Sequence, residues 1–61
     1  MFVSDYNVGD YEVEVDDEAL KAVVIYLPTG KPIKKFNGET AWSDARRHAE
    51  DMHIAMKGSK Y

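Results

Sequence analysis

The sequence predicts a small α+β domain in which a three-stranded antiparallel meander is packed by one C-terminal helix. Residues 11–15 alternate between apolar and acidic side chains, which is typical of a half-buried strand. Residues 22–27 are apolar throughout and rich in β-branched side chains, as in a central strand. Residues 42–56 carry apolar side chains at helical spacing. The expected order is therefore βββα, within one domain that spans residues 1–61.

The first ten residues show no sustained hydrophobic period, so we expect a flexible arm or a short edge strand there. A fourth strand of the sheet is the alternative. In the strand that follows, Tyr11, Val13 and Val15 are expected to point toward the core. The acidic residues 16–18 end this strand, because clustered acids are poor strand formers.

A hairpin joins the second and third predicted strands. Residues 28–30, Pro-Thr-Gly, form its turn, because proline presets φ and glycine accepts a positive φ. Pro32 cannot donate a backbone hydrogen bond, so the returning strand, residues 32–36, should lie at an edge of the sheet. The expected register places Ile25 opposite Ile33, Val24 opposite Lys34 and Ala22 opposite Phe36.

The helix should begin after Thr40, a suitable N-cap, and end near Gly58. Its apolar stripe is expected to consist of Trp42, Ala45, Ala49, Met52 and Met56. The sheet face beneath the helix is expected to carry Val13, Val15, Val23, Ile25 and Ile33. The opposite face is expected to carry Glu12, Glu14, Val24, Tyr26 and Lys34.

Composition indicates a folded protein, since 44% of the residues are hydrophobic and 31% are charged. The chain has no cysteine, so disulfides and thiolate metal sites are excluded. The longest apolar run, residues 22–27, is far shorter than the ~20 residues of a membrane span. The start of the chain lacks the basic and apolar regions of a signal peptide. We therefore expect a cytoplasmic protein.

The sequence favours a non-enzymatic protein without cofactor or metal. His48 and His53 are five residues apart, so a helix would direct them about 140° from each other, whereas two helical ligands need a spacing of three or four. No serine lies in a nucleophile-elbow context, and no glycine-rich phosphate loop is present. Nothing in the acidic segment indicates the burial of one carboxylate that acid–base catalysis needs.

The charges are strongly polarised along the chain. Residues 1–20 carry seven acids and no lysine or arginine, whereas residues 21–61 carry all eight bases and four acids. The acids invite three interpretations: docking to a basic protein surface, mimicry of nucleic acid, or a solubilising edge strand. Mimicry rests on alternate strand residues that project at ~6.8 Å intervals, close to the ~7 Å between phosphates of an extended strand. The candidate contact residues are Asp10, Tyr11, Glu12, Glu14, Asp16, Asp17, Glu18 and Tyr26.

Two other functions remain as alternatives. A nucleic-acid binder would use the basic and aromatic residues Lys34, Lys35, Phe36, Arg46 and Arg47. Against it, adjacent strand residues point to opposite faces, and Arg46 and Arg47 have acids one helical turn away, Glu50 and Asp51. A homodimeric structural module would use apolar residues without a predicted burial site, of which Phe2, Tyr6 and Ile54 are the candidates.

An acidic hairpin followed by a tryptophan-containing helix, with Thr-Ala-Trp-Ser-Asp-Ala at residues 40–45, resembles many small bacteriophage or mobile-element proteins. The resemblance implies a protein that inhibits a host enzyme by binding it, and it assigns no residue roles. The sequence thus predicts a small inhibitor-like module. Its acids and tyrosines would dock onto a basic groove of a larger protein that handles nucleic acid.

Overall fold

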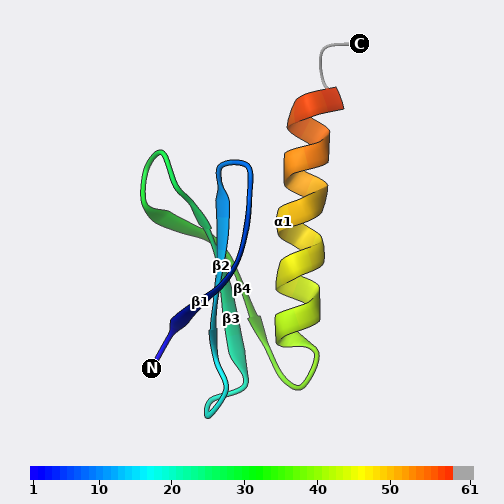
Figure 1. Cartoon of the computed structure of the whole chain (residues 1–61). Helices are drawn as coiled ribbons and strands as arrows, with labels where there is room; N and C mark the ends of the chain where they lie inside the picture. Colours follow the sequence, from blue (N-terminus) through cyan, green and yellow to red (C-terminus); the bar gives the residue numbers. More distant parts are fainter. Residues whose placement is uncertain (59–61) are drawn as a thin grey trace.

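The computed structural model describes the backbone of residues 1–58 and the side chains of residues 1–55. Its elements are β1 (Val3–Val8), β2 (Tyr11–Asp16), β3 (Lys21–Tyr26), β4 (Lys31–Asn37) and α1 (Ala41–Gly58). The strands form one antiparallel sheet in the order β1-β2-β3-β4, and α1 lies along one face of it (Figure 1). The predicted α+β class is therefore confirmed, and the predicted alternative of a fourth, N-terminal strand is the one observed.

The N-terminal strand β1 is irregular, which explains why its sequence shows no period. Ser4 lies opposite Glu14 and Tyr6 lies opposite Val13, so Asp5 is the extra residue of a β-bulge. The strand then turns into β2 through Gly9 and Asp10. Gly9 has a φ of 57°, as the first position of a two-residue hairpin requires.

The β3–β4 hairpin departs from the expected register near its turn. Val24 lies opposite Lys34 and Ala22 opposite Phe36, as predicted, but Ile25 lies opposite Pro32 rather than Ile33. Ile33 is therefore the extra residue of a second bulge. The turn is one residue longer than expected, since Tyr26 rather than Leu27 closes it with Lys31. As predicted, β4 is an edge strand and Gly30 has a positive φ.

The sheet face beneath the helix differs from the prediction in β3. Tyr11, Val13 and Val15 face the helix as expected, but their partners across the ladder are Tyr26, Val24 and Ala22. Directly opposed residues lie on the same face. Val23 and Ile25 consequently lie on the face away from the helix, together with Glu12 and Glu14. The prediction was wrong here because an apolar run carries no alternation from which its inward face can be read.

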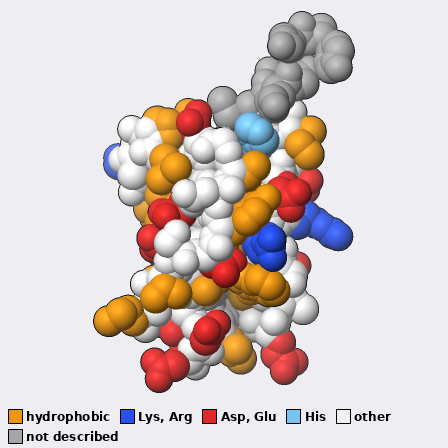
Figure 2. Space-filling view, in the orientation of Figure 1, with side chains coloured by type: hydrophobic (Ala, Val, Ile, Leu, Met, Phe, Trp, Pro, Cys, Tyr) orange, Lys and Arg blue, Asp and Glu red, His pale blue; other side chains and the backbone are white. Residues whose placement is uncertain are grey.

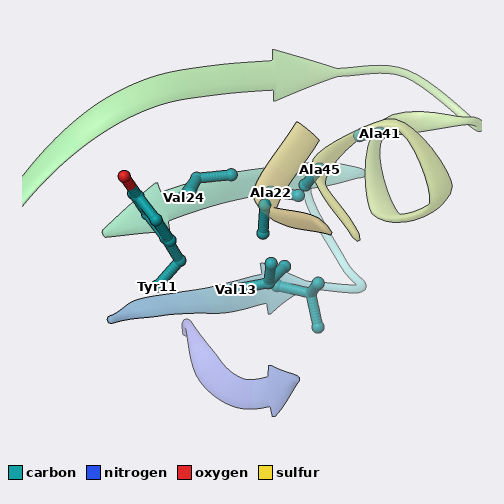
Figure 3. Close-up of a cluster of buried hydrophobic side chains, with 8 residues drawn as sticks. Tyr11, Val13, Ala22, Val24, Ala41 and Ala45 are labelled. Carbon is teal, nitrogen blue, oxygen red and sulfur yellow. The ribbon is translucent and has the colours of Figure 1, made fainter. Parts of the chain in front are cut away.

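The core is thin because the helix approaches the sheet through alanines. Ala41, Ala45 and Ala49 are almost completely buried, and Figure 3 shows Ala45 next to Ala22 of β3. The predicted stripe is corrected at its first position, since Ala41 is buried and Trp42 is 45% exposed. Ala45, Ala49 and Met52 contact the core as expected, whereas the Met56 side chain lies outside the described residues.

The helix begins where predicted. The Thr40 carbonyl accepts the first helical bond from the backbone N–H of Asp44, and the Thr40 hydroxyl donates to the Asp44 carboxylate at 3.0 Å. The link before it is tied to the β2–β3 turn, because Gly38 N–H donates to the Leu20 carbonyl at 2.8 Å. This bond holds the link that precedes α1 beside the β2–β3 turn.

Candidate functional site

Three carboxylates form a row on the open face of the sheet, the face away from α1. Glu12, Glu14 and Asp16 alternate with the buried residues of β2 and therefore project together, at about 6.8 Å intervals. The sequence suggested an acidic edge strand, but β2 is hydrogen-bonded to β1 on one side and to β3 on the other. The acids therefore lie on an interior strand, and neither edge strand of the sheet, β1 or β4, carries this row.

Two carboxylates of this row, those of Glu12 and Asp16, accept hydrogen bonds from different groups. Ser4 Oγ donates to Glu12 Oε2 at 2.7 Å, and the N-terminal amine of Met1 donates to Asp16 Oδ2 at 3.0 Å. Asp16 Oδ1 also accepts the backbone N–H groups of Glu18 and Ala19, at 3.1 and 3.3 Å. The N-terminal amine is the main cause of a lowered pKa at Asp16, and these two backbone bonds act in the same direction.

An apolar groove of about 500 Å³ runs beside the acidic row. Val23 and Ile25 of β3 line it, and Phe2, Glu14, Pro32 and Lys35 are among the other residues that line it. Val23 is only 8% exposed although no helix covers it, because the side chains around it shield it. The open face thus places the carboxylates of β2 on one flank of an apolar strip and Lys35 of β4 on the other.

The two tyrosines predicted to accompany the acids lie on the other side of the sheet. Tyr11 is 3% exposed and belongs to the core. Its ring centroid is 5.4 Å from that of Tyr26, which faces the helix and is half-buried. Because both tyrosines face the helix, neither is brought together with Glu12 and Glu14.

The remaining acids of the predicted set lie in turns. Asp10 is in the β1–β2 turn, where its carbonyl accepts the backbone N–H of Leu27 at 2.8 Å. Asp17 and Glu18 are exposed in the β2–β3 turn, next to Asp16. Asp10 and these two acids therefore extend the row at opposite ends, as the sequence suggested for the run.

The residues of the two alternative functions are dispersed. Lys34 lies 5.8 Å from the ring centroid of Phe36 on the helix side, whereas Lys35 lies opposite Val23 on the open face. Arg46 lies against the sheet side of the helix and Arg47 is exposed. The dimer candidates are also separated: Phe2 lines the open-face groove, Tyr6 contacts Arg46, and Ile54 lies on the outer surface of α1.

A cluster that the sequence did not predict joins β1 to the helix. The Trp42 indole N–H donates to the Asp5 carboxylate. The Arg46 guanidinium carbon lies 5.0 Å from the Trp42 ring centroid and 4.6 Å from that of Tyr6. Arg46 is thus placed between two aromatic rings and does not form the expected pair with Glu50. The i,i+4 spacing of Trp42 and Arg46 was a usable signal, but nothing in the sequence indicated Asp5.

The two histidines have separate neighbours. His48 has its ring centroid 5.8 Å from that of Phe36 in an edge-on arrangement. His53 lies against Gly9 in the β1–β2 turn. Within residues 1–55, no group of three or more histidine, aspartate and glutamate side chains is arranged to hold a metal ion.

Comparisons with known proteins identify no relative of this chain. No family model matches the chain, and neither the curated proteins nor the solved structures contain a match. In the part of the chain that the structure describes, no helix is long and apolar enough to cross a membrane.

Proposed function

We propose that this chain is a small, non-enzymatic protein-binding module that docks the open face of its sheet onto a basic surface of a larger protein. The observation that carries the proposal is the carboxylate row of Glu12, Glu14 and Asp16, which runs beside an apolar groove on the face that the helix leaves uncovered. The tyrosines take no part in this surface.

The two parts of the open face have different roles in binding. Carboxylates mainly accelerate encounter with a basic partner and fix its orientation, whereas burial of apolar area supplies most of the affinity. Phe2, at 43% exposure, and the partly exposed Ile25 provide that apolar area, whereas Val23 beside them is already largely buried. A partner with a row of basic side chains beside an apolar ridge would match this arrangement.

The concrete form of the proposal is an inhibitor that occludes a nucleic-acid-binding groove. The spacing of about 6.8 Å between alternate carboxylates of β2 is close to the distance between phosphates of an extended strand. A groove that binds phosphates could therefore bind these carboxylates at a similar spacing. The resemblance to small bacteriophage or mobile-element proteins supports the same form of the proposal.

The test combines capture of a partner with matched charge variants. The tagged chain is used to capture partners from host lysate, and each captured protein is purified and titrated against three forms of the chain. Glu12→Gln with Glu14→Gln removes two charges from the open face. Glu50→Gln with Asp51→Asn removes the same number from exposed positions of α1 and serves as the control.

The proposal predicts that binding weakens with added salt and that the open-face variant loses about tenfold in affinity, more than the control variant. It also predicts that nucleic acid competes with the chain for the captured protein. Equal losses in the two variants, or binding that is insensitive to ionic strength, would contradict it.

A further inference from the structure

A second groove lies at the end of the sheet, where the β2–β3 turn meets the link between β4 and α1. We call it the tryptophan groove; it measures about 470 Å³, and the residues that line it include Val3, Asp5, Asp17, Leu20, Glu39 and Trp42. Three of its large apolar side chains are exposed: Val3 at 53%, Leu20 at 50% and Trp42 at 45%. Figure 2 shows acidic and hydrophobic side chains interspersed at this lower end of the molecule.

Trp42 is held in place although it is half exposed. Its indole N–H donates to Asp5, and the Arg46 guanidinium lies over its ring. These contacts fix the ring before any partner arrives, so binding would cost little side-chain entropy. A fixed tryptophan at a groove is the kind of residue that dominates the energy of protein interfaces.

The charge around the groove indicates that its partner is positively charged. Four carboxylates line it, those of Asp5, Asp16, Asp17 and Glu39, against the single cation of Lys21. The N-terminal amine offsets Asp16, but the other three carboxylates have no cationic partner within residues 1–55. An apolar groove with a negative rim complements an aliphatic side chain that has basic neighbours.

We infer that the tryptophan groove binds a segment of another protein in which an aliphatic side chain is flanked by arginine or lysine. The aliphatic side chain packs on Trp42 and Leu20, and the basic side chains approach Asp17 and Glu39. The groove shares Asp16 with the carboxylate row and Lys21 with the open-face groove. The residues that contact the bound segment, Trp42, Leu20, Asp17 and Glu39, line only the tryptophan groove, so the inference does not depend on the proposed function.

The test uses Trp42 itself, since it is the sole tryptophan of the chain. The probe is a short acetylated and amidated peptide in which leucine is flanked by arginines. Its titration should shift the Trp42 emission to shorter wavelength and saturate. The same peptide with glycine in place of leucine, or with glutamates in place of arginines, should leave the emission unchanged. An unchanged emission with the leucine–arginine peptide would overturn the inference.

Charge variants separate this groove from general attraction to an acidic protein. Asp17→Asn with Glu39→Gln should weaken peptide binding about fivefold, since each exposed charge pair contributes modestly. Glu12→Gln with Glu14→Gln makes the same change in net charge on the open face and should have no effect. Equal weakening by both double variants would refute a specific site.

Two further variants test the apolar contact. Trp42→Ala should weaken binding of a fluorescently labelled peptide about thirtyfold, measured by anisotropy. Leu20→Asn should also weaken binding while the protein stays folded, because asparagine tolerates the positive φ at this position. Full affinity in Leu20→Asn would contradict the inference. So would a Trp42 emission that shifts with protein concentration alone, because a second copy would then be the occupant.

Discussion

Gly9 in the β1–β2 turn lies directly against the imidazole of His53 in α1. A β-carbon added at Gly9 would come within 2.6 Å of His53 Cε1, and the φ of 57° at this position is itself unfavourable for other residues. The turn of the first hairpin is therefore fitted to the helix, and the glycine is needed for two independent reasons.

Gly9→Ala should consequently destabilise the protein more than an alanine at another turn glycine. The positive φ costs about 1–2 kcal/mol, and overpacking against His53 adds about 1–3 kcal/mol. Gly30→Ala is the matched control, because Gly30 has a φ of 72° and open space around it. In the His53→Ala background, urea unfolding should show that Gly9→Ala costs only the positive-φ contribution, because the overpacking against His53 is removed. Equal effects of Gly9→Ala and Gly30→Ala would contradict the contact.

Leu20 offers a stabilising change. It is the only non-glycine residue with a positive φ within residues 1–58, at 52°, and it ends the β2–β3 turn. Leu20→Gly should raise the free energy of unfolding by about 0.5–1 kcal/mol, because relief of the strained φ exceeds the entropic cost of glycine. Leu27→Gly, at a similarly exposed turn residue without a positive φ, should have the opposite sign. A loss of stability in Leu20→Gly would contradict this expectation.

The close approach of α1 to the sheet depends on Ala45. Its side chain is fully buried between the helix and the strands. Ala45→Leu should therefore force the two layers apart and cost about 1–3 kcal/mol. Ala55→Leu, at an exposed position of the same helix, should change stability by less than about 0.5 kcal/mol. Thermal unfolding by circular dichroism compares the two, and similar melting temperatures would argue against the tight layer spacing.

Asp16 should make the stability depend on acid pH. Its pKa is lowered from 3.8 chiefly by the N-terminal amine, so the folded state releases this proton more readily than the unfolded state. The resulting stability is present above pH 3.8 and is lost as the pH falls through the lower folded pKa. Asp16→Asn should remove that part of the pH dependence, as measured by urea midpoints between neutral and strongly acidic pH. Asp17→Asn, whose carboxylate takes no part in these bonds, should retain it.

Within the sheet, a clear alternation predicted the buried face of a strand correctly, and an apolar run without alternation did not. The alternation of Tyr11, Val13 and Val15 fixed both the strand and its buried face, as observed. In β3, by contrast, both faces are apolar, so the sequence could not decide between Val23 and Val24 as the inward residue. In the folded chain, the pairing of β3 with β2 places Val24 opposite Val13 and therefore on the inward face. This one reversal separated Tyr26 from the acids with which it was expected to act.

The candidate sites were predicted less completely than the fold, because they depend on contacts distant in the chain. The bulge at Asp5 disrupts the alternation of β1, so this strand was predicted only as an alternative to a flexible arm, and the contact of Asp5 with Trp42 was not predicted. Trp42 was expected in the core from its helical spacing. Ala41 lies one helical turn before Ala45, so its spacing also fits the apolar stripe. Its side chain is smaller than that of Trp42 and allows the closer packing of helix and sheet that the structure adopts.

The chain order of the sheet has a consequence for how the protein folds. Every strand pairs with its immediate neighbour in sequence, across turns of only two or four residues. Such pairings close short loops and lose little chain entropy, and domains rich in local contacts reach the native state quickly. We therefore expect folding on the order of milliseconds or faster, with the three hairpins able to form before the helix seals the core.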